Sequence, residues 1–312
     1  MIRVFFGLLL GFCVAACSEK TEQERWLFMG DSITQAGFYV DHVETWLLLN
    51  EESPPEVIDL GLSSETISGL SEPGHPFPRP YAHSRLDDVL ERVKPDVVFA
   101  CYGMNCGIYH PFSDERFAAY QTGVLELIEK SRRVGAEVVL LTPPPFAGRV
   151  KPKDPPLEGE DFGYKRPAAD YDEVLRRYGK WILSLSAREG VRSINIREGL
   201  DRFMEECYPK EPVHPSPYGH ELMGEALLLG LGKISESQML ETGVNTRKEE
   251  AHWNALMELV RLEREVYDRS LLNDIGHGNP GVMKRFGQPM EEAERQRAEV
   301  AAKIEALLLE RN

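Results

Sequence analysis

Short apolar runs alternate with longer amphipathic segments along most of this chain, a pattern typical of parallel β-sheets covered by helices. The apolar runs predict five strands, at residues 26–29, 57–60, 97–101, 138–141 and 191–196. The segments between them carry apolar residues at three- and four-residue spacing, which predicts helices at residues 40–49, 85–93, 114–133, 171–188 and 218–231. The alternation therefore predicts an α/β fold with a doubly wound, mostly parallel five-stranded sheet, in which functional groups lie beyond the carboxyl ends of the strands.

Two parts of the chain fall outside this alternation. Residues 142–167 are rich in proline, glycine and charge and are too long for an ordinary connection. Because they follow the fourth strand, we expect them to form a wall of the functional site, the alternative being a loosely ordered surface excursion. From residue 247 onward two helices are expected, at 247–272 and 289–310, separated by the helix-breaking stretch 276–281. We interpret them as a helical extension packed on the α/β domain.

The first residues have the layout of a signal peptide. An apolar run over residues 4–16 is too short to cross a bilayer, and the small residues just before Cys17 suit a signal peptidase. This segment resembles the bacterial lipobox, in which the cysteine becomes the lipidated first residue of the mature protein; an ordinary secretory signal is the alternative. The sequence predicts a signal peptide over 1–16, a lipid anchor on Cys17 and a linker over 17–24.

The predicted location is the cell envelope, with the protein held to a membrane by its lipid. By resemblance to known lipoprotein sorting, Ser18 rather than Asp after the cysteine favours the outer membrane. The formal net charge of −15 disfavours nucleic acid and anionic lipid surfaces as partners and suits a neutral substrate. Three internal cysteines allow at most one disulfide: Cys106 could pair with Cys207, but three free buried thiols, with Cys101, are the favoured alternative.

The first predicted strand runs into Gly30-Asp31-Ser32, and a helical pattern follows immediately. A serine in this position lies at the carboxyl edge of the sheet and near a helix N-terminus, whose free amides stabilise a developing negative charge. The segment predicts a nucleophile at Ser32. The alternative is a residue that only caps the helix.

A histidine in a proline-rich loop, His214, lies far downstream and three residues after Glu211. A carboxylate at this spacing can accept a hydrogen bond from one imidazole nitrogen and leave the other nitrogen facing a serine. Pro212 favours this arrangement because it disfavours a helical conformation at Glu211. With Ser32 the loop predicts a Ser-His-Glu triad; the alternative is a surface glutamate, with a backbone carbonyl holding the ring.

Two further segments follow predicted strands. Asn105, in Tyr102-Gly103-Met104-Asn105, can donate its side-chain amide to the oxyanion of a tetrahedral intermediate. Gly61, in Asp59-Leu60-Gly61, can offer its backbone amide to the same oxyanion. A simple turn is the alternative for each segment, but together they place one catalytic group at each of four positions along one sheet edge.

In this order the four segments resemble the SGNH (GDSL-like) hydrolases, whose blocks are a GDS serine, a glycine, a G-x-N and a D-x-x-H. The resemblance covers residues 26–233. It implies an SGNH/flavodoxin-like fold, with a hydrolase domain over 25–235 and a C-terminal helical extension over 236–312.

The resemblance also implies the roles of individual residues. Ser32 is the nucleophile, His214 is the general base, and the Ser32 amide, Gly61 and Asn105 form the oxyanion hole. Glu211 stands where the family usually has aspartate, and Cys106 stands where aspartate often follows the asparagine.

The expected function is a serine esterase that hydrolyses short acyl esters, with O-acetyl groups on carbohydrate as the substrate. A lysophospholipase or lipase of the same fold is one alternative, favoured by the lipid anchor and by Phe146 and Phe162 in the long segment. A non-catalytic envelope binding protein is another, favoured only by Glu211 and Cys106. We expect no metal or other cofactor, because no zinc-ligand spacing occurs; His220 is expected to cap or pack the last helix of the domain.

Overall fold

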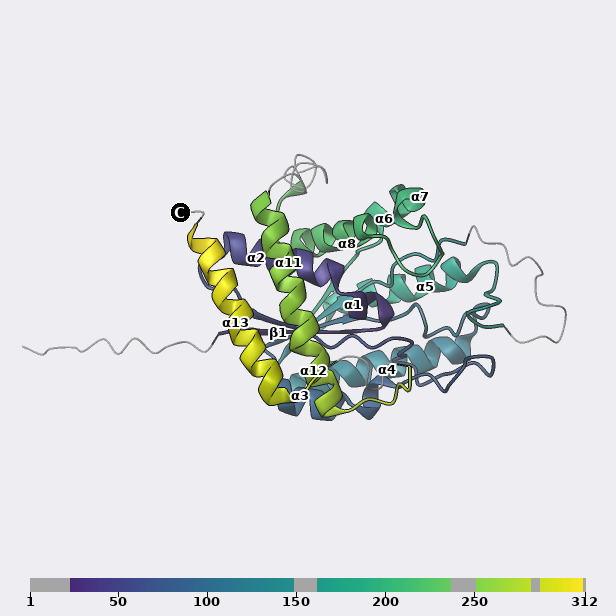
Figure 1. Ribbon diagram of the computed structural model, residues 1–312. Helices are drawn as coiled ribbons and strands as arrows, with labels where there is room; N and C mark the ends of the chain where they lie inside the picture. Colours follow the sequence, from purple (N-terminus) through teal and green to yellow (C-terminus); the bar gives the residue numbers. More distant parts are fainter. Residues whose placement is uncertain (1–22, 149–161, 237–250, 282–286, 311–312) are drawn as a thin grey trace, which may run out of the picture.

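Five strands form one parallel sheet in the computed structural model, which describes residues 23–148, 162–236, 251–281 and 287–310 (Figure 1). The strands are β1 (Arg25–Gly30), β2 (Glu56–Asp59), β3 (Val97–Cys101), β4 (Glu137–Leu141) and β5 (Val191–Ile194). Their order across the sheet is β2-β1-β3-β4-β5, and each neighbouring pair is parallel. The strand order reverses between β1 and β3, and in such sheets ligands bind beyond the carboxyl ends of the strands at this point.

Helices cover both faces of the sheet. Their bounds are α1 (Ser32–Ala36), α2 (Phe38–Asn50), α3 (Leu86–Val93), α4 (Asp114–Arg133), α5 (Tyr171–Ser184), α6 (Glu198–Arg202), α7 (Met204–Cys207), α8 (Pro217–Gly230), α11 (Ala251–Val266), α12 (Asp268–Ile275) and α13 (Met290–Leu309). Helices α2 and α8 lie side by side on one face, whereas α3 and α4 lie on the other (Figure 1). Helix α5 packs beside α4, where the rings of Tyr178 and Tyr120 stack with their centroids 4.3 Å apart.

The predicted sheet, its covering helices and the C-terminal helices are confirmed. The elements that the sequence pattern missed are short: α1, α6 and α7 have four or five residues each, too few to show a helical period. The helix expected over 247–272 is interrupted at Tyr267, between α11 and α12, and α12 continues to Ile275. Residues 247–250 lie outside the described part of the chain.

The apolar runs of the sequence are the strands of the sheet, and the central strands are buried on both faces as parallel strands usually are, whereas the edge strand β5 has an exposed residue, Arg192. All five residues of β3 are buried. Phe99 of β3 stacks on Phe28 of β1 with their ring centroids 4.5 Å apart. Truncating a core phenylalanine to alanine costs about 3 to 5 kcal/mol of stability, so this contact helps to fix the register that places Gly30 opposite Cys101 at the carboxyl end.

The C-terminal extension packs against the α/β domain through α11, which contacts α2, and α13 packs against α11 (Figure 1). Leu256 and Val260 of α11 and Val300 and Ile304 of α13 form a small second core. Arg264 of α11 forms a buried ion pair with Asp41 of α2, with an Nε to Oδ1 distance of 2.7 Å. None of the described helices is both long and apolar enough to cross a bilayer. The segment 1–22, with the predicted signal and Cys17, lies outside the described residues.

Candidate active site

The catalytic-serine candidate lies in the tight connection between β1 and α1. The Asp31 carboxylate caps α1 by accepting a hydrogen bond from the Ile33 amide at 3.0 Å, so Ser32 is the first residue of the helix. Gly30 is required before it, because a Cβ there would lie 2.1 Å from Thr34 Oγ1 and 2.8 Å from the Cys101 carbonyl. The local sequence therefore places the Ser32 hydroxyl at the carboxyl edge of the sheet.

Ser32, His214 and Glu211 are brought together as the sequence predicted. Ser32 Oγ lies 2.8 Å from His214 Nε2, although 182 residues separate the two. His214 Nδ1 lies 2.6 Å from Glu211 Oε1. The three side chains thus form a chain of hydrogen bonds with a hydroxyl at one end and a carboxylate at the other.

The glutamate fits its place because its side chain folds back over its own loop. Glu211 Oε1 also accepts a hydrogen bond from the His214 backbone amide at 2.6 Å, and Oε2 accepts one from the Val213 amide at 2.9 Å. The extra methylene of glutamate, relative to aspartate, is taken up by this turn. The loop itself is tied to the chain after β4, since the Ala147 amide donates to the Pro212 carbonyl at 2.9 Å.

The two side chains shift each other's ionisation. The hydrogen bond that His214 donates to Glu211 raises the pKa of His214 above its ordinary value, although burial acts in the opposite direction. Burial alone would raise the pKa of Glu211, but the hydrogen bonds from the His214 ring and the Val213 amide outweigh burial and hold this pKa below its ordinary value. The carboxylate therefore stays ionised and keeps the proton of the imidazole on Nδ1, which leaves Nε2 facing Ser32.

Asn105 lies in the loop after β3 and is almost completely buried, with 4% of its surface exposed. Its Oδ1 accepts a hydrogen bond from the Tyr109 hydroxyl at 3.1 Å, and its Nδ2 lies 3.4 Å from the Glu65 carbonyl. The hydroxyl of Tyr109 fixes which side of the amide carries the donor. No pattern in the sequence marks Tyr109 as a residue of the site. In the structure the backbone here is strained, since Ile108 and Tyr109 both have a positive φ, 48° and 61°, and strain of this kind is often found at functional sites.

Gly61 has a different environment from the one expected. Its amide donates to Asp59 Oδ1 at 2.8 Å, so in this geometry the amide is already engaged and not directed at a substrate oxyanion. The glycine is needed for packing, because a Cβ would lie 2.3 Å from the Gln35 amide nitrogen of α1. Three residues later, Ser64 has a φ of 66°, and its amide donates no backbone hydrogen bond within the described residues.

Buried ion pairs support the loops of the site. Arg85 donates to Glu65 from Nε and Nη2, at 2.7 Å each, beneath the loop after β2. Arg79 donates to Glu72 at 2.5 and 2.6 Å, and its Nη1 reaches the Ser64 carbonyl at 3.3 Å. Breaking a buried pair of this kind costs about 3 to 5 kcal/mol, so these arginines hold the backbone around the site firmly.

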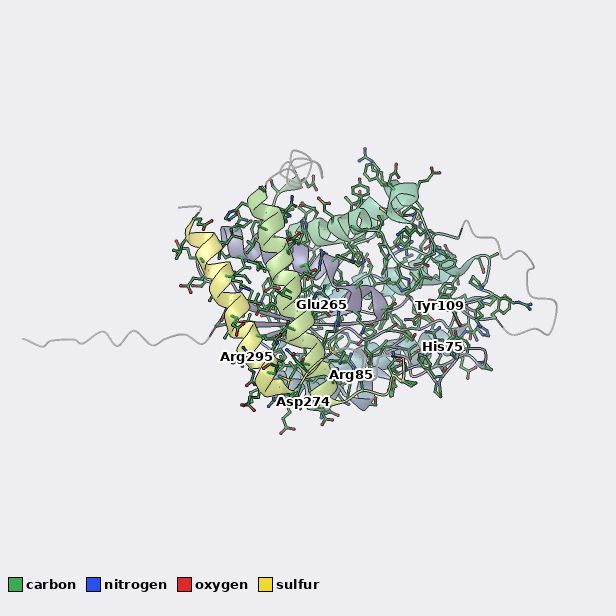
Figure 2. All side chains as sticks on the ribbon, in the orientation of Figure 1. His75, Arg85, Tyr109, Glu265, Asp274 and Arg295 are labelled. Carbon is green, nitrogen blue, oxygen red and sulfur yellow. The ribbon has the colours of Figure 1, made fainter. Side chains whose placement is uncertain are left out.

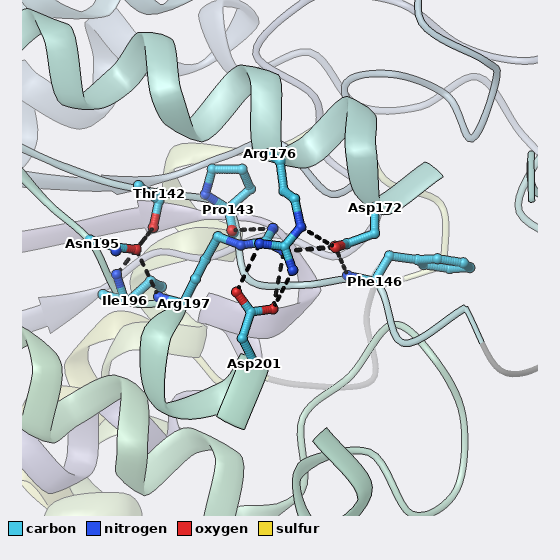
Figure 3. Close-up of polar contacts among 9 residues, drawn as sticks. All are labelled: Thr142, Pro143, Phe146, Asp172, Arg176, Asn195, Ile196, Arg197 and Asp201. Atoms are coloured by element: carbon cyan, nitrogen blue, oxygen red, sulfur yellow. Dashed lines mark hydrogen bonds and ion pairs between the residues drawn. The ribbon is translucent and has the colours of Figure 1, made fainter. Parts of the chain in front are cut away.

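The described part of the long segment after β4 lies beside the predicted histidine loop. Phe146 is buried, with its ring centroid 6.1 Å from that of Tyr109. Figure 3 shows how the segment is anchored: the Phe146 amide donates to Asp172, which also pairs with Arg197 at 2.8 Å. Residues 142–148 thus form part of the wall near His214, and residues 149–161 lie outside the described chain.

The remaining candidates have structural environments. Cys101, Cys106 and Cys207 are free and buried, so the structure does not pair Cys106 with Cys207, and the favoured alternative of free thiols agrees with it. His220 packs against Tyr39, with a centroid distance of 6.1 Å, and burial lowers the pKa of its imidazole to about 3. His220 is therefore a neutral packing residue.

The sequence of the chain matches the model of a known protein family. The model of the GDSL-like lipase/acylhydrolase family matches residues 28–222. The chain belongs to this family. The protein is thus a hydrolase of the lipase/acylhydrolase kind. The matched part runs from β1 to α8, so it contains Ser32, Asn105 and His214 but not the C-terminal extension.

Solved structures also show similarity to the chain. An acetylxylan esterase from Geobacillus stearothermophilus, as a catalytic mutant, is 20% identical with a TM-score of 0.50, and the match covers 67% of this chain and 94% of that one. A putative lipolytic protein of the G-D-S-L family from Desulfitobacterium hafniense is 19% identical with a TM-score of 0.46, covering 67% and 99%. No curated protein matches the chain in sequence.

Proposed function

We propose that this family member is a serine esterase that hydrolyses short acyl esters, with O-acetyl groups on carbohydrate as its substrate. The observation that carries the proposal is the pair of contacts at His214. Its Nε2 lies 2.8 Å from Ser32 Oγ, and its Nδ1 lies 2.6 Å from Glu211 Oε1. This is the arrangement that activates a serine for attack on an ester.

The proposed reaction proceeds in two steps. His214 Nε2 accepts the proton of Ser32 as Oγ attacks the acyl carbon, and the imidazolium then gives this proton to the departing alcohol. Water, deprotonated by the same nitrogen, attacks the acyl-enzyme, and the acid leaves as Ser32 regains its proton. Throughout, the carboxylate of Glu211 stabilises the imidazolium.

The oxyanion formed in each step requires nearby hydrogen-bond donors. The side-chain amide of Asn105 and the backbone amide of Ser32, at the first position of α1, are two proposed donors. The third donor was expected to be the Gly61 amide, but this amide already donates to Asp59. The Ser64 amide is therefore the better candidate. It belongs to the same loop, and the next residue, Glu65, has its carbonyl 3.4 Å from Asn105 Nδ2.

Three observations support a small acyl group on a neutral, polar substrate. The side chain of His214 is half exposed, at 50%, and that of Glu211 is 40% exposed, so the catalytic base lies near the surface. The net charge of −15 disfavours anionic substrates by long-range repulsion. The fold is shared with an acetylxylan esterase.

The test compares p-nitrophenyl acetate, a long-chain p-nitrophenyl ester and an acetylated xylo-oligosaccharide. We expect hydrolysis of the acetate and release of acetate from the sugar, and much slower turnover of the long chain. Ser32→Ala should abolish turnover, whereas Ser84→Ala, a change of an exposed serine that bonds only the nearby Tyr81 carbonyl, should leave it intact. Activity retained in Ser32→Ala would refute the proposal. A preference for the long-chain ester would show that the protein is a lipase and not a short-chain esterase.

A further inference from the structure

The C-terminal extension lies outside the family match, yet four of its polar side chains end on segments of the catalytic site. These contacts involve α1, which begins with Ser32, and the loop that follows β2. We propose that the extension positions the catalytic serine and the loop that follows β2, which we call the oxyanion loop. Arg269 and Asn279 are the main positioning residues. The catalytic part of this inference rests on the proposed esterase function.

The first contact point is the end of α1. A helix of five residues leaves its last carbonyls without partners in the helix, and these must be satisfied from outside. The Gln35 carbonyl accepts a hydrogen bond from Arg269 Nη2 and lies 3.4 Å from Arg264 Nη1. Cationic donors at the carboxyl end of a helix are favourable, so both arginines stabilise α1 where the helix itself cannot.

The approach of Arg264 depends on a glycine. Gly37 follows α1 with a φ of 74°, and a Cβ at this residue would lie 2.3 Å from Arg264 Cζ. The guanidinium therefore packs directly on the backbone at the turn between α1 and α2. Asp41 of α2 accepts from Arg264 at 2.7 and 3.1 Å and fixes the guanidinium in this place.

The second contact point is the loop after β2. Asp268 Oδ2 accepts a hydrogen bond from the Asp59 amide at 2.8 Å, at the end of the strand. Asn279 Nδ2 donates to the Ser63 carbonyl, next to Ser64. The Ser63 amide in turn donates to the Gln35 side chain at 3.0 Å, so the loop and α1 are joined to each other as well as to the extension.

All four side chains from the extension are at least 95% buried. A buried carbonyl that loses its donor is unfavourable, and the backbone can avoid this by moving toward another partner. Movement of α1 separates Ser32 from His214, because His214 is held independently by its own loop. A misplacement of about 1 Å at the reacting atoms can lower turnover about a hundredfold.

A purely supporting role for the extension is the competing explanation, and Arg297 of α13 provides the control. Arg297 donates to Glu263 at 2.8 Å and to Glu56 at 2.7 Å. Glu56 opens β2 at the amino end of the strand, opposite to the catalytic edge. Figure 2 shows the same separation: Arg295 of α13 lies far from Tyr109, which belongs to the site. Arg297→Met therefore removes partly buried ion pairs of the extension without touching α1 or the oxyanion loop.

The experiment uses the full chain with Arg269→Met, Arg269→Lys, Asn279→Ala, Arg297→Met and the parent. Two quantities are measured: kcat and KM on p-nitrophenyl acetate, and hydrogen exchange of the amides in residues 32–36 and 59–66. For Arg269→Met and Asn279→Ala we expect kcat to fall about tenfold or more with KM within about threefold, and exchange in both segments to accelerate. Arg269→Lys, which keeps a cationic donor, should recover part of the lost kcat.

For Arg297→Met we expect a lower Tm, with kcat and exchange in the two segments unchanged. The proposal is overturned if Arg269→Met and Asn279→Ala keep kcat within twofold of the parent, or if Arg297→Met loses as much kcat at an equal loss of Tm. It is also overturned if exchange in residues 32–36 and 59–66 is unchanged in all variants. Failure of the esterase function gives a separate result, a parent without Ser32-dependent turnover, and hydrogen exchange then still decides whether the extension holds these segments.

Discussion

Glu211 holds the catalytic histidine through a side chain that folds over its own backbone. Because this carboxylate raises the pKa of His214, the base loses its proton only above its ordinary pKa of 6.5. Activity should therefore rise with pH, with the midpoint of kcat/KM above pH 6.5. Glu211→Gln removes the negative charge, so this midpoint should move to lower pH, while kcat should fall about a hundredfold or more because the imidazolium is no longer stabilised.

The measurement is kcat/KM against pH on a soluble ester for the parent, Glu211→Gln, Glu211→Asp and Glu91→Gln. Glu91 is an exposed residue of α3, so its change should leave the profile as it is. Glu211→Asp should be active but slower, because the loop is shaped for the longer side chain. If the kcat/KM of Glu211→Gln lies within threefold of the parent value, His214 works with Ser32 alone and Glu211 has no part in the mechanism.

Tyr109 fixes the orientation of Asn105 through its hydroxyl. Tyr109→Phe keeps the ring that packs on Tyr171, with a centroid distance of 4.9 Å, but frees Asn105 Oδ1. Because the amide can then turn its donor away for part of the time, kcat should fall about tenfold, less than the hundredfold or more for complete loss of one oxyanion donor, with KM little changed. The control is Tyr171→Phe, which removes a buried hydroxyl that donates to the Met104 carbonyl at 2.7 Å. Equal effects of the two changes on kcat would remove Tyr109 from the oxyanion hole.

Asp31 is a buried cap whose ionisation weakens the fold. Burial raises the pKa of its carboxyl to about 6, against an ordinary value of 3.8. Between these two pH values the folded state binds more protons than the unfolded state, so the stability contributed by the protonated carboxyl is lost as the pH rises from about 4 to about 6. At pH 8 the stability lost in this way, relative to a pH below 4, is about 3 kcal/mol of the free energy of unfolding.

Asp31→Asn keeps a cap of similar strength without the charge. We expect it to raise the free energy of unfolding at pH 8 by about 1 to 3 kcal/mol and to change it little at pH 4. Urea unfolding at the two pH values measures both quantities. A stability gain of equal size at both pH values would show that ionisation of Asp31 is not its cause.

Individual residues differ in how well the sequence predicts them. Ser32, His214, Glu211 and Asn105 stand in recognisable sequence surroundings; the structure brings Ser32, His214 and Glu211 within hydrogen-bond distance and places Asn105 in the loop after β3, while their catalytic roles stay a prediction. The capture of the Gly61 amide by Asp59 could not be predicted, because it depends on a side-chain rotamer that competes with the expected ligand. Tyr109 was missed for a related reason: a tyrosine in a loop has no pattern that reveals what its hydroxyl meets.

At the scale of elements, α1 and the strand connection after β2 are packed backbone to backbone at Gly61. In Gly61→Ala the new methyl group would lie 2.3 Å from the Gln35 amide nitrogen, which no side-chain motion can relieve. The helix must move, so both stability and turnover should fall, with kcat lowered about tenfold or more. Thermal unfolding and ester hydrolysis measure this, with Gly232→Ala as the control.

Gly232 lies beyond α8 and, unlike Gly61, has a positive φ, 74°, but a Cβ there would meet no atom within 4 Å. Its replacement should therefore lower Tm modestly and leave kcat unchanged. A Gly61→Ala variant with the kinetics of the parent would show that α1 can shift without moving Ser32.

Long periodic elements were predicted well, because their pattern reports burial directly. The five strands and the helices on the sheet lie close to the predicted residues. The interruption at Tyr267 was missed because the apolar spacing continues across it; what divides α11 from α12 is tertiary, since Asp268 turns inward to the amide of Asp59. Contacts of this kind, made across more than two hundred residues, leave no local signal in the sequence.

At the scale of the whole molecule, the lipid anchor remains a prediction from the sequence. Cys17 follows a short apolar run and small residues, and we propose that it carries the acyl chains. Cys17→Ala should abolish labelling with a palmitate analogue and release the protein from membranes, with hydrolysis of a soluble ester unchanged. Cys207→Ala, the loss of a buried free thiol, is the control for labelling. Labelling that persists in Cys17→Ala would show that the lipid is attached to another residue.

The parallel sheet explains why the site could be assembled from sequence at all. The carboxyl ends of all five strands lie at one edge, so residues that follow different strands must meet there. This rule brings together Ser32 and Asn105 without any knowledge of distances. It has no counterpart for the helical extension, whose docking surface depends on side chains of both partners.

A ribosome delivers the chain from its amino end, and this order has a consequence for when the enzyme becomes active. The Gln35 carbonyl can be hydrogen-bonded by Arg264 and Arg269 only after these residues have been synthesised, 229 and 234 residues later. Contacts at such separations form late, after the local ones. A nascent chain that has emerged as far as α8 already holds its three catalytic side chains, yet α1 still lacks its outer partners. Ester hydrolysis by such a partial chain should therefore be slower than hydrolysis by a chain that already carries α11 and α12.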